Sequence, residues 1–292
     1  MSITSMMVRA MFKEGDDKRD AGLTTPEDIV RFDDILYGAD PKWQALDVYR
    51  PKAAGDRPLP VIVSVHGGGW VYGDKERYQY YCMSLAQRGF AVVNFTYRLA
   101  PEFKFPSSLE DTNLAFSWVL SHGAEYGFDT NHIFGVGDSA GAQILALFSC
   151  ICTNPAYAAK YPFCAPQGFV PTALALNCGV YRIEPKGNDM TAMLMKELLP
   201  HKGTPEEIEL LNVLDYITGD FPPTLYMTCS DDFLKDQAPL LGARLEQEGV
   251  RYESRFYGDE KHKLGHVFHC NMKSEDAKQC NDDECAFFRT FV

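Results

Sequence analysis

The 292-residue sequence lacks the features that mark several classes of protein. It has no run of about 18 apolar residues, which a membrane-spanning helix needs. It also has no internal repeat, low-complexity tract or long Gly/Ser linker. Its first twenty residues contain neither a sustained apolar core nor a small-residue cleavage site, so we expect no secretory signal. These absences favour a globular protein of the cytoplasm.

Positive charge is scarce. The 28 Lys and Arg residues are outnumbered by 40 Asp and Glu residues, which gives a formal net charge of −12. An acidic chain repels nucleic-acid phosphates and anionic lipid headgroups, so we expect neither nucleic acid nor a membrane as a partner. The apolar fraction of 46% and the charged fraction of 23% are ordinary for a globular protein, and they exclude a disordered or fibrous one.

The cysteines do not form a recognisable framework. Their number is odd, no Cys-x-x-Cys pair occurs, and several lie inside apolar runs such as LFSCIC. We therefore expect buried, reduced thiols and no zinc site. The nine are Cys82, Cys150, Cys152, Cys164, Cys178, Cys229, Cys270, Cys280 and Cys285.

From residue 60 onward, strand patterns alternate with helix patterns at short spacing. VIVSVH and FAVVNFTYR are continuous β-branched or apolar runs, whereas KERYQYYCMSLAQRG has a helical pattern that ends at Gly89. Before this region, RFDDILYG and WQALDVYRP predict two antiparallel strands. The alternation predicts an α/β fold with a mostly parallel sheet and helices on both faces.

Two segments stand outside this alternation. Residues 1–30 predict a short amphipathic helix followed by a charged connection from Glu14 to Asp20. Residues 182–220 predict two helices, MTAMLMKELLP and TPEEIELLNVLDYI. We expect a single domain over 1–292 in which both segments cap the carboxyl edge of the sheet, where ligands bind in such folds. The alternative is that they pack away from the site.

The sequence Gly-Asp-Ser-Ala-Gly at 137–141 is the strongest chemical signal. It follows the strand HIFGVG and opens the helix AGAQILALF. A serine on a sharp strand-to-helix turn exposes its hydroxyl, and the helix N-terminus behind it favours developing negative charge. This context predicts that Ser139 is a nucleophile.

The sequence His-Gly-Gly-Gly-Trp at 66–70 comes directly after the strand VIVSVH. Three glycines allow the backbone to turn its N–H groups toward a substrate oxygen, as an oxyanion hole requires. We expect Gly67, Gly68 and Ala140 to supply the donors. His66 lies in this same loop, and we expect it to be a structural imidazole.

Together, HGGGW, YRLAPE and GDSAG resemble the hormone-sensitive-lipase-like branch of the α/β-hydrolase fold, in particular its bacterial carboxylesterases and acetyl esterases. The resemblance runs from about Asp47 to the C-terminus and is weak over 1–30 and 182–220. It implies an α/β-hydrolase fold with a small helical cap, ester hydrolysis, and a catalytic triad in the order Ser, acid, His.

The acid should follow the strand PPTLYMTCS. The family's Asp-x-Leu-x-x-Asp pattern resembles the sequence from Asp232 to Asp236, with one residue fewer after the leucine. Asp232 is therefore the predicted acid, and Asp231 is the alternative if the register differs by one. We expect Asp236 to cap the following helix.

The base should follow the last strand, VRYESRFYG. The family's His-Gly-Phe resembles the sequence that begins at His266, with valine in place of glycine. His266 is therefore the predicted base, with His262 and His269 as alternatives. Trp70, Tyr72 and Phe233 are candidate walls of the substrate pocket.

The residues thus predict a serine carboxylesterase for short-chain, acetyl-type esters, with carbohydrate or xylan-fragment acetates as one version. Its expected partner is a small-molecule ester, it needs no metal or organic cofactor, and a homodimer is left open. Because the triad and the glycine loop lie elsewhere, we expect removal of residues 1–30 to raise KM more than it lowers kcat. The rival interpretations are a non-catalytic small-molecule receptor on the same scaffold and a peptidase or amidase of the same fold.

Overall fold

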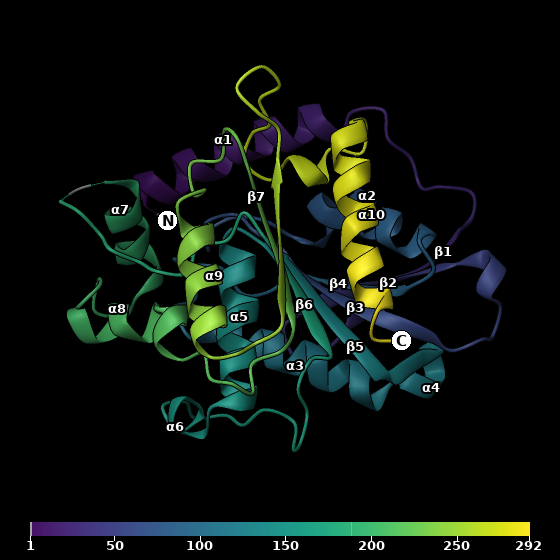
Figure 1. The fold of residues 1–292 in the computed structure, drawn as a ribbon, viewed down its shortest axis with the longest axis horizontal. Helices are drawn as coiled ribbons and strands as arrows, with labels where there is room; N and C mark the ends of the chain where they lie inside the picture. Colours follow the sequence, from purple (N-terminus) through teal and green to yellow (C-terminus); the bar gives the residue numbers. More distant parts are fainter. Residues whose placement is uncertain (1, 188) are drawn as a thin grey trace.

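The computed structural model describes residues 2–187 and 189–292, and it is built around one eight-stranded sheet (Figure 1). The strand order is β1-β2-β4-β3-β5-β6-β7-β8, in which β1 and β2 are antiparallel to their neighbours and the other strands are parallel. The predicted antiparallel pair and the predicted parallel sheet are both confirmed. The strands are β1 (Ile29–Leu36), β2 (Ala45–Pro51), β3 (Leu59–Val65), β4 (Ala91–Phe95), β5 (Phe128–Asp138), β6 (Ala173–Asn177), β7 (Thr224–Cys229) and β8 (Tyr252–Tyr257).

Helices cover both faces of the sheet, because successive residues of each central strand point to opposite sides. In β3, Val61 and Val63 pack into one apolar cluster with α3, α5 and α9, whereas Ile62 packs into another with α2 and α10. The helices are α1 (Ile3–Asp20), α2 (Lys75–Gln87), α3 (Ser107–Ser121), α4 (Gly123–Tyr126), α5 (Ala140–Thr153), α6 (Pro155–Ala158), α7 (Met190–Leu198), α8 (Pro205–Leu211), α9 (Gln237–Gln247) and α10 (Glu275–Arg289). Three short 3₁₀ segments are η1 (Lys52–Ala54), η2 (Val213–Asp215) and η3 (Phe268–Cys270).

The helix at the N-terminus, α1, is longer than predicted. The sequence suggested that a connection begins at Glu14, but the helix continues to Asp20. Ion pairs one turn apart stabilise the charged part, since Lys13 lies 2.6 Å from Asp17 and Lys18 lies 2.6 Å from Glu14. Such pairs stabilise a helix modestly, and the contacts of α1 with the rest of the chain, described below, add to them.

The segment 182–220 forms two helices, α7 and α8, as predicted, but α8 ends at Leu211. The rest of the predicted second helix is the short 3₁₀ segment η2 and irregular chain. The capping box of α8 is present, with the Thr204 side chain accepting from the Glu207 backbone and the Glu207 side chain accepting from the Thr204 backbone. In Figure 1, α1 crosses the top of the molecule and α7 lies next to its N-terminal end. Both helices are therefore at the edge of the sheet where the parallel strands end.

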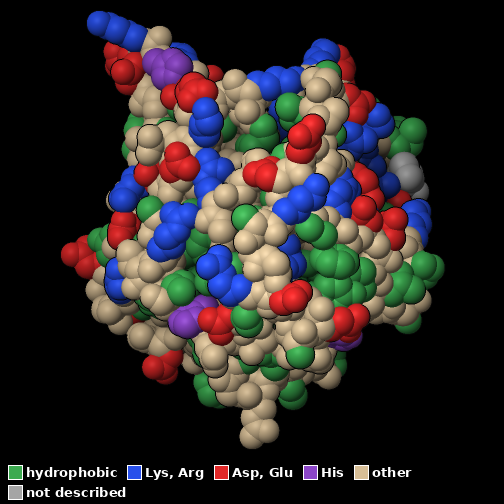
Figure 2. Space-filling view, turned by 90° about the vertical axis from the view of Figure 1, so that its right-hand side faces the viewer, with side chains coloured by type: hydrophobic (Ala, Val, Ile, Leu, Met, Phe, Trp, Pro, Cys, Tyr) green, Lys and Arg blue, Asp and Glu red, His purple; other side chains and the backbone are tan. Residues whose placement is uncertain are grey.

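Figure 2 views the molecule from the right-hand side of Figure 1, and it shows Lys and Arg side chains intermingled with Asp and Glu, with groups of hydrophobic side chains between them. This face therefore offers no extended basic patch of the kind that binds nucleic acid. Within the described part of the chain, no helix combines the length and the apolar character needed to cross a bilayer.

Candidate active site

Ser139 occupies a sharp turn between β5 and α5. Its backbone has φ 52° and ψ −120°, a strained conformation for a residue other than glycine. The flanking glycines are required by close packing: a Cβ on Gly137 would lie 2.8 Å from the carbonyl oxygen of Gly141, and a Cβ on Gly141 would lie 2.1 Å from that of Val65. The turn therefore lifts the hydroxyl of Ser139 above the end of the sheet.

The three predicted triad residues lie in one line of hydrogen bonds. His266 Nε2 is 3.0 Å from Ser139 Oγ, and His266 Nδ1 is 2.7 Å from Asp232 Oδ1. The Asp232 carboxylate also accepts from Thr228 Oγ1 at 2.8 Å and from the Leu234 N–H at 2.9 Å. Burial opposes ionisation of Asp232, but the hydrogen bond and charge of His266, with these donors, hold the pKa of Asp232 below its usual value.

The loop that carries His266 is tied to the end of β7. Asp231 forms an isolated parallel bridge with Gly265, and its N–H donates to the Leu264 carbonyl at 2.9 Å. The Asp231 side chain is exposed, 4.0 Å from Lys263 Nζ. The alternative acid therefore points away from the imidazole. Asp236 stands at the N-cap of α9 as predicted, but its side chain makes no cap hydrogen bond.

The other two candidate bases lie in unsuitable surroundings. His269 is fully buried against the Tyr81 ring, and burial lowers its pKa to about 3. His262 is exposed and hydrogen-bonds the Asp276 carboxylate at 2.9 Å. Neither of these imidazoles hydrogen-bonds Ser139, whereas the imidazole of His266 does.

His66 is a buried structural ring, as the sequence suggested. Its ring stacks on Tyr97 with a centroid distance of 4.0 Å, and burial lowers its pKa to about 4. Its Nδ1 lies 2.7 Å from the Gly67 carbonyl oxygen, which requires the proton to be on Nδ1. Since the two ends of a planar trans peptide point in opposite directions, this bond turns the Gly68 N–H away from His66.

One of the three predicted oxyanion donors is wrong. The Gly67 N–H donates to Tyr78 Oη at 3.0 Å, and Tyr78 Oη donates in turn to Asp138 Oδ2 at 2.8 Å. Burial raises the pKa of Asp138 to about 6. By contrast, the N–H groups of Gly68 and Gly69 have no acceptor among residues 2–187 and 189–292. Both glycines have positive φ, 117° and 60°, a conformation that other residues rarely adopt.

Sequence reasoning missed the pair Tyr78 and Asp138. Asp138 is the variable position of the Gly-x-Ser-x-Gly motif, and its charge on a buried turn is a signal that it has a partner. Nothing in the sequence around Tyr78 distinguishes its hydroxyl from that of the other tyrosines in α2. Only the fold brings it to the glycine loop.

The three residues predicted to line the substrate pocket lie in different surroundings in the structure. Trp70 is 7% exposed, and its indole N–H donates to Gln143 Oε1 at 2.8 Å, so this ring belongs to the core. Tyr72 turns toward α1, where its hydroxyl donates to Asp16 at 2.8 Å. Phe233 is 74% exposed, with its ring 4.2 Å from that of His266. Only Phe233 lies at the mouth of the site.

The described residues contain one group of potential metal ligands, Cys178, Cys229 and Asp232. Each thiol already has an acceptor, the Met227 sulfur at 3.8 Å and the Gly265 carbonyl at 3.2 Å. We therefore treat the two thiols as packing behind Asp232. All nine cysteines are free, and seven of them are buried as expected, whereas Cys152 is half-buried and Cys164 is exposed.

Comparison with known proteins agrees with this geometry. The family described as alpha/beta hydrolase fold matches residues 62–266, a range that includes HGGGW, YRLAPE and GDSAG. The chain belongs to the alpha/beta hydrolase fold family. The resemblance of this hydrolase to the bacterial carboxylesterases is thereby confirmed at the level of the family.

Three proteins illustrate what the hydrolase is similar to. Esterase LipC of Mycobacterium tuberculosis is 36% identical over 129 residues, which are 44% of this chain but only 32% of LipC. Versiconal hemiacetal acetate esterase of Dothistroma septosporum is 26% identical over 226 residues, 72% of this chain and 68% of that protein. The crystal structure of esterase B from Lactobacillus rhamnosis with a tributyrin phosphonate has a TM-score of 0.88 and 26% identity, covering 99% of this chain and 95% of that one.

Proposed function

We propose that this hydrolase is a serine carboxylesterase that cleaves short-chain, acetyl-type esters. The observation that carries the proposal is the unbroken hydrogen-bonded line from Ser139 through His266 to Asp232. A non-catalytic receptor on the same scaffold has no need of this line. The esterase names of the relatives support the same activity.

The geometry suggests how the reaction proceeds. Asp232 orients the imidazole of His266, which takes the proton from Ser139 as its oxygen attacks the ester carbonyl. The oxyanion is then held by backbone N–H groups of Gly68, Gly69 and Ala140, the last of which opens α5 and has no partner within the helix. His266 gives its proton to the leaving alcohol, and water releases the acyl group by the reverse sequence.

The cap supports a short acyl group. In the single domain that we propose, α1 and the segment 182–220 form the cap. A Cβ on Gly69 would lie 3.5 Å from Leu194 Cδ1, so α7 stands directly above the glycine loop. Acetyl esters of sugars or xylan fragments are one substrate class for such a site. The acetate esterase and the tributyrin phosphonate complex among the relatives also involve short acyl groups.

The first test concerns the nucleophile. Ser139→Ala should lower kcat by at least about 10³-fold, because the covalent step loses its oxygen. An organophosphonate should label Ser139 in the wild-type protein, and intact-mass and peptide analysis would locate the adduct. A modified serine elsewhere in the folded protein would contradict the assignment.

The second test concerns acyl length. A p-nitrophenyl ester series from acetate to laurate should give the best kcat/KM at about two to four acyl carbons, since each methylene that stays in water forfeits about 0.8 kcal/mol of burial. Acetylated oligosaccharides run beside the series would test the carbohydrate version. A preference for decanoate or longer would overturn the short-acyl proposal.

A further inference from the structure

Helix α1 holds the chain that follows the three glycines. Arg9 Nε donates to the Val71 carbonyl at 2.6 Å, and its terminal nitrogens donate to the Ala100 carbonyl at 2.9 Å and to Glu102 at 2.6 Å. One largely buried guanidinium thus joins α1 to two separate backbone segments. The planar fork of arginine suits such a multiple contact, which lysine cannot reproduce.

A second contact lies two turns further along α1. Tyr72 Oη donates to Asp16 at 2.8 Å, and the Tyr72 ring meets Phe12 edge-on with a centroid distance of 5.8 Å. Asp16 is itself held by Arg19, whose guanidinium lies 2.9 Å from it. The hydroxyl of Tyr72 is therefore hydrogen-bonded to a carboxylate whose position is held by an ion pair within α1.

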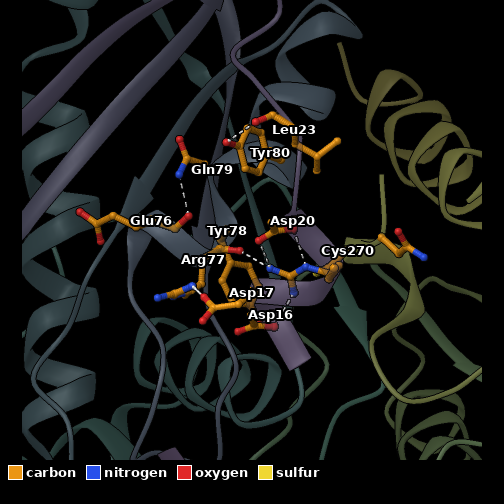
Figure 3. Close-up of polar contacts among 12 residues, drawn as sticks. Asp16, Asp17, Asp20, Leu23, Glu76, Arg77, Tyr78, Gln79, Tyr80 and Cys270 are labelled. Carbon is orange, nitrogen blue, oxygen red and sulfur yellow. Dashed lines mark hydrogen bonds and ion pairs between the residues drawn. The ribbon is translucent and has the colours of Figure 1, made fainter. Parts of the chain in front are cut away.

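A third contact joins the end of α1 to the first turn of α2 (Figure 3). Arg19 donates to the Arg77 carbonyl at 2.5 Å, and the Arg77 side chain pairs with Asp17 at 2.5 Å. The next residue is Tyr78, whose hydroxyl accepts the Gly67 N–H. Both ends of the glycine loop are thus connected to α1.

Hydrogen bonds inside the glycine loop connect the residues that α1 contacts with the proposed oxyanion donors. The N–H groups of Val71 and Tyr72 both donate to the Gly68 carbonyl, at 3.3 and 3.0 Å. That carbonyl belongs to the same planar peptide as the Gly69 N–H, which must then point the opposite way. The backbone N–H groups of Val71 and Tyr72 therefore help to set the direction of a proposed oxyanion donor.

We propose that α1 is a positioning element of the oxyanion hole, with Arg9 and Asp16 as positioning residues that act through Val71 and Tyr72. The inference rests on the proposed esterase function and deepens it. It also replaces the expectation from the sequence that loss of residues 1–30 raises KM more than it lowers kcat. Weakening the contacts of Arg9 and Asp16 with Val71 and Tyr72 lowers kcat, because the N–H donors are needed when the oxyanion forms.

The experiment compares Arg9→Met and Tyr72→Phe with wild type on p-nitrophenyl acetate, with kcat expressed per serine titrated by the phosphonate. We expect kcat to fall about tenfold to a hundredfold for Arg9→Met and less for Tyr72→Phe, with KM within about twofold, since loss of one oxyanion donor costs about 10²–10³ and misplacement costs less. Arg9→Lys should recover only part of the loss. Lys18→Met is the matched control, because this α1 side chain is 75% exposed and should leave kcat unchanged.

A transition-state mimic distinguishes a misplaced oxyanion donor from a loss of correctly folded protein. A reversible trifluoromethyl ketone forms an oxyanion on the serine, so its Ki should rise in the same proportion as kcat falls. Unchanged kcat and Ki, a rise in KM alone, or a fall only in the number of titratable sites would each overturn the proposal. A wild-type protein that cleaves no ester in the series would instead overturn the proposed function, and the inference with it.

Discussion

Two neighbouring aspartates follow β7, and their carboxylates lie in different environments. Asp232 is buried and accepts from His266, whereas Asp231 is exposed near Lys263. The family pattern favoured Asp232 but left the register open by one residue. The difference in burial and partner supports Asp232 as the proposed acid, because its carboxylate is the one that contacts the His266 imidazole.

The mutational test uses this pair as its own control. Asp232→Asn should lower kcat by about 10²–10⁴, because the amide cannot hold the His266 tautomer and charge in the same way. Asp231→Asn should leave kcat within about twofold, since its side chain contacts solvent. Steady-state kinetics on p-nitrophenyl acetate would measure both, and a larger effect at Asp231 would show that the acid is misassigned.

At the residue level, prediction from sequence works where a motif is local. Ser139 lies in five consecutive residues, and the strand and helix around it are visible in the same stretch of sequence. The oxyanion donors proposed from the structure differ in part from those predicted, because the N–H of Gly67 is bound by Tyr78, eleven residues further along. That hydrogen bond forms through the packing of α2, which no local pattern reports.

At the level of elements, helices α7 and α8 show a local sequence signal, whereas the second half of α1 depends on contacts with distant residues. Both helices of the segment 182–220 were predicted, and the start of α8 carries a local capping signal in Thr204 and Glu207. The charged half of α1 was predicted as a connection, since its sequence lacks an apolar stripe. It is helical because its charges pair along the helix and with α2, as in the bond between Asp17 and Arg77.

Helix α7 offers a test of acyl selectivity. Leu194→Ala should open space above Gly69, and the ratio of kcat/KM for octanoate to that for butyrate should rise about fourfold or more, since one accommodated methylene is worth about 0.8 kcal/mol. Lys196→Ala is the control, because it lies two residues on and therefore on the opposite side of the helix. An unchanged ratio for Leu194→Ala would place the acyl group elsewhere.

For the whole molecule, the sequence indicated the alternation of strands and helices but not how distant elements join. β4 enters the sheet between β2 and β3, an order that periodicity does not specify. The last helix is fastened by Glu284, whose carboxylate accepts from Tyr81, 203 residues away, and from Asn177 at the end of β6. The backbone carbonyl of Asn177 in turn accepts the Ser139 N–H at 2.9 Å.

This buried carboxyl should make stability depend on pH. Burial raises the pKa of Glu284 to about 7, against hydrogen bonds from Tyr81 and Asn177 and the charge of Arg88, which lower it. The folded state therefore binds its proton more tightly than the unfolded state does, so the contribution to stability is present below about pH 4.5 and is lost as the pH rises through about 7. Glu284→Gln cannot ionise, and its free energy of unfolding should gain up to about 3 kcal/mol on wild type between pH 4.5 and 8.

Urea unfolding at a series of pH values would measure this difference, and subtracting wild type removes the titration of other groups such as Asp138. Glu275→Gln, at an 87% exposed carboxylate in the same helix, should show no pH-dependent difference. The Asn177 amide oxygen has no partner within the described residues, so a turned Asn177 amide can accept from the glutamine. A constant difference between Glu284→Gln and wild type across this pH range would mean that Glu284 stays ionised, and that its two hydrogen-bond donors and the charge of Arg88 outweigh burial.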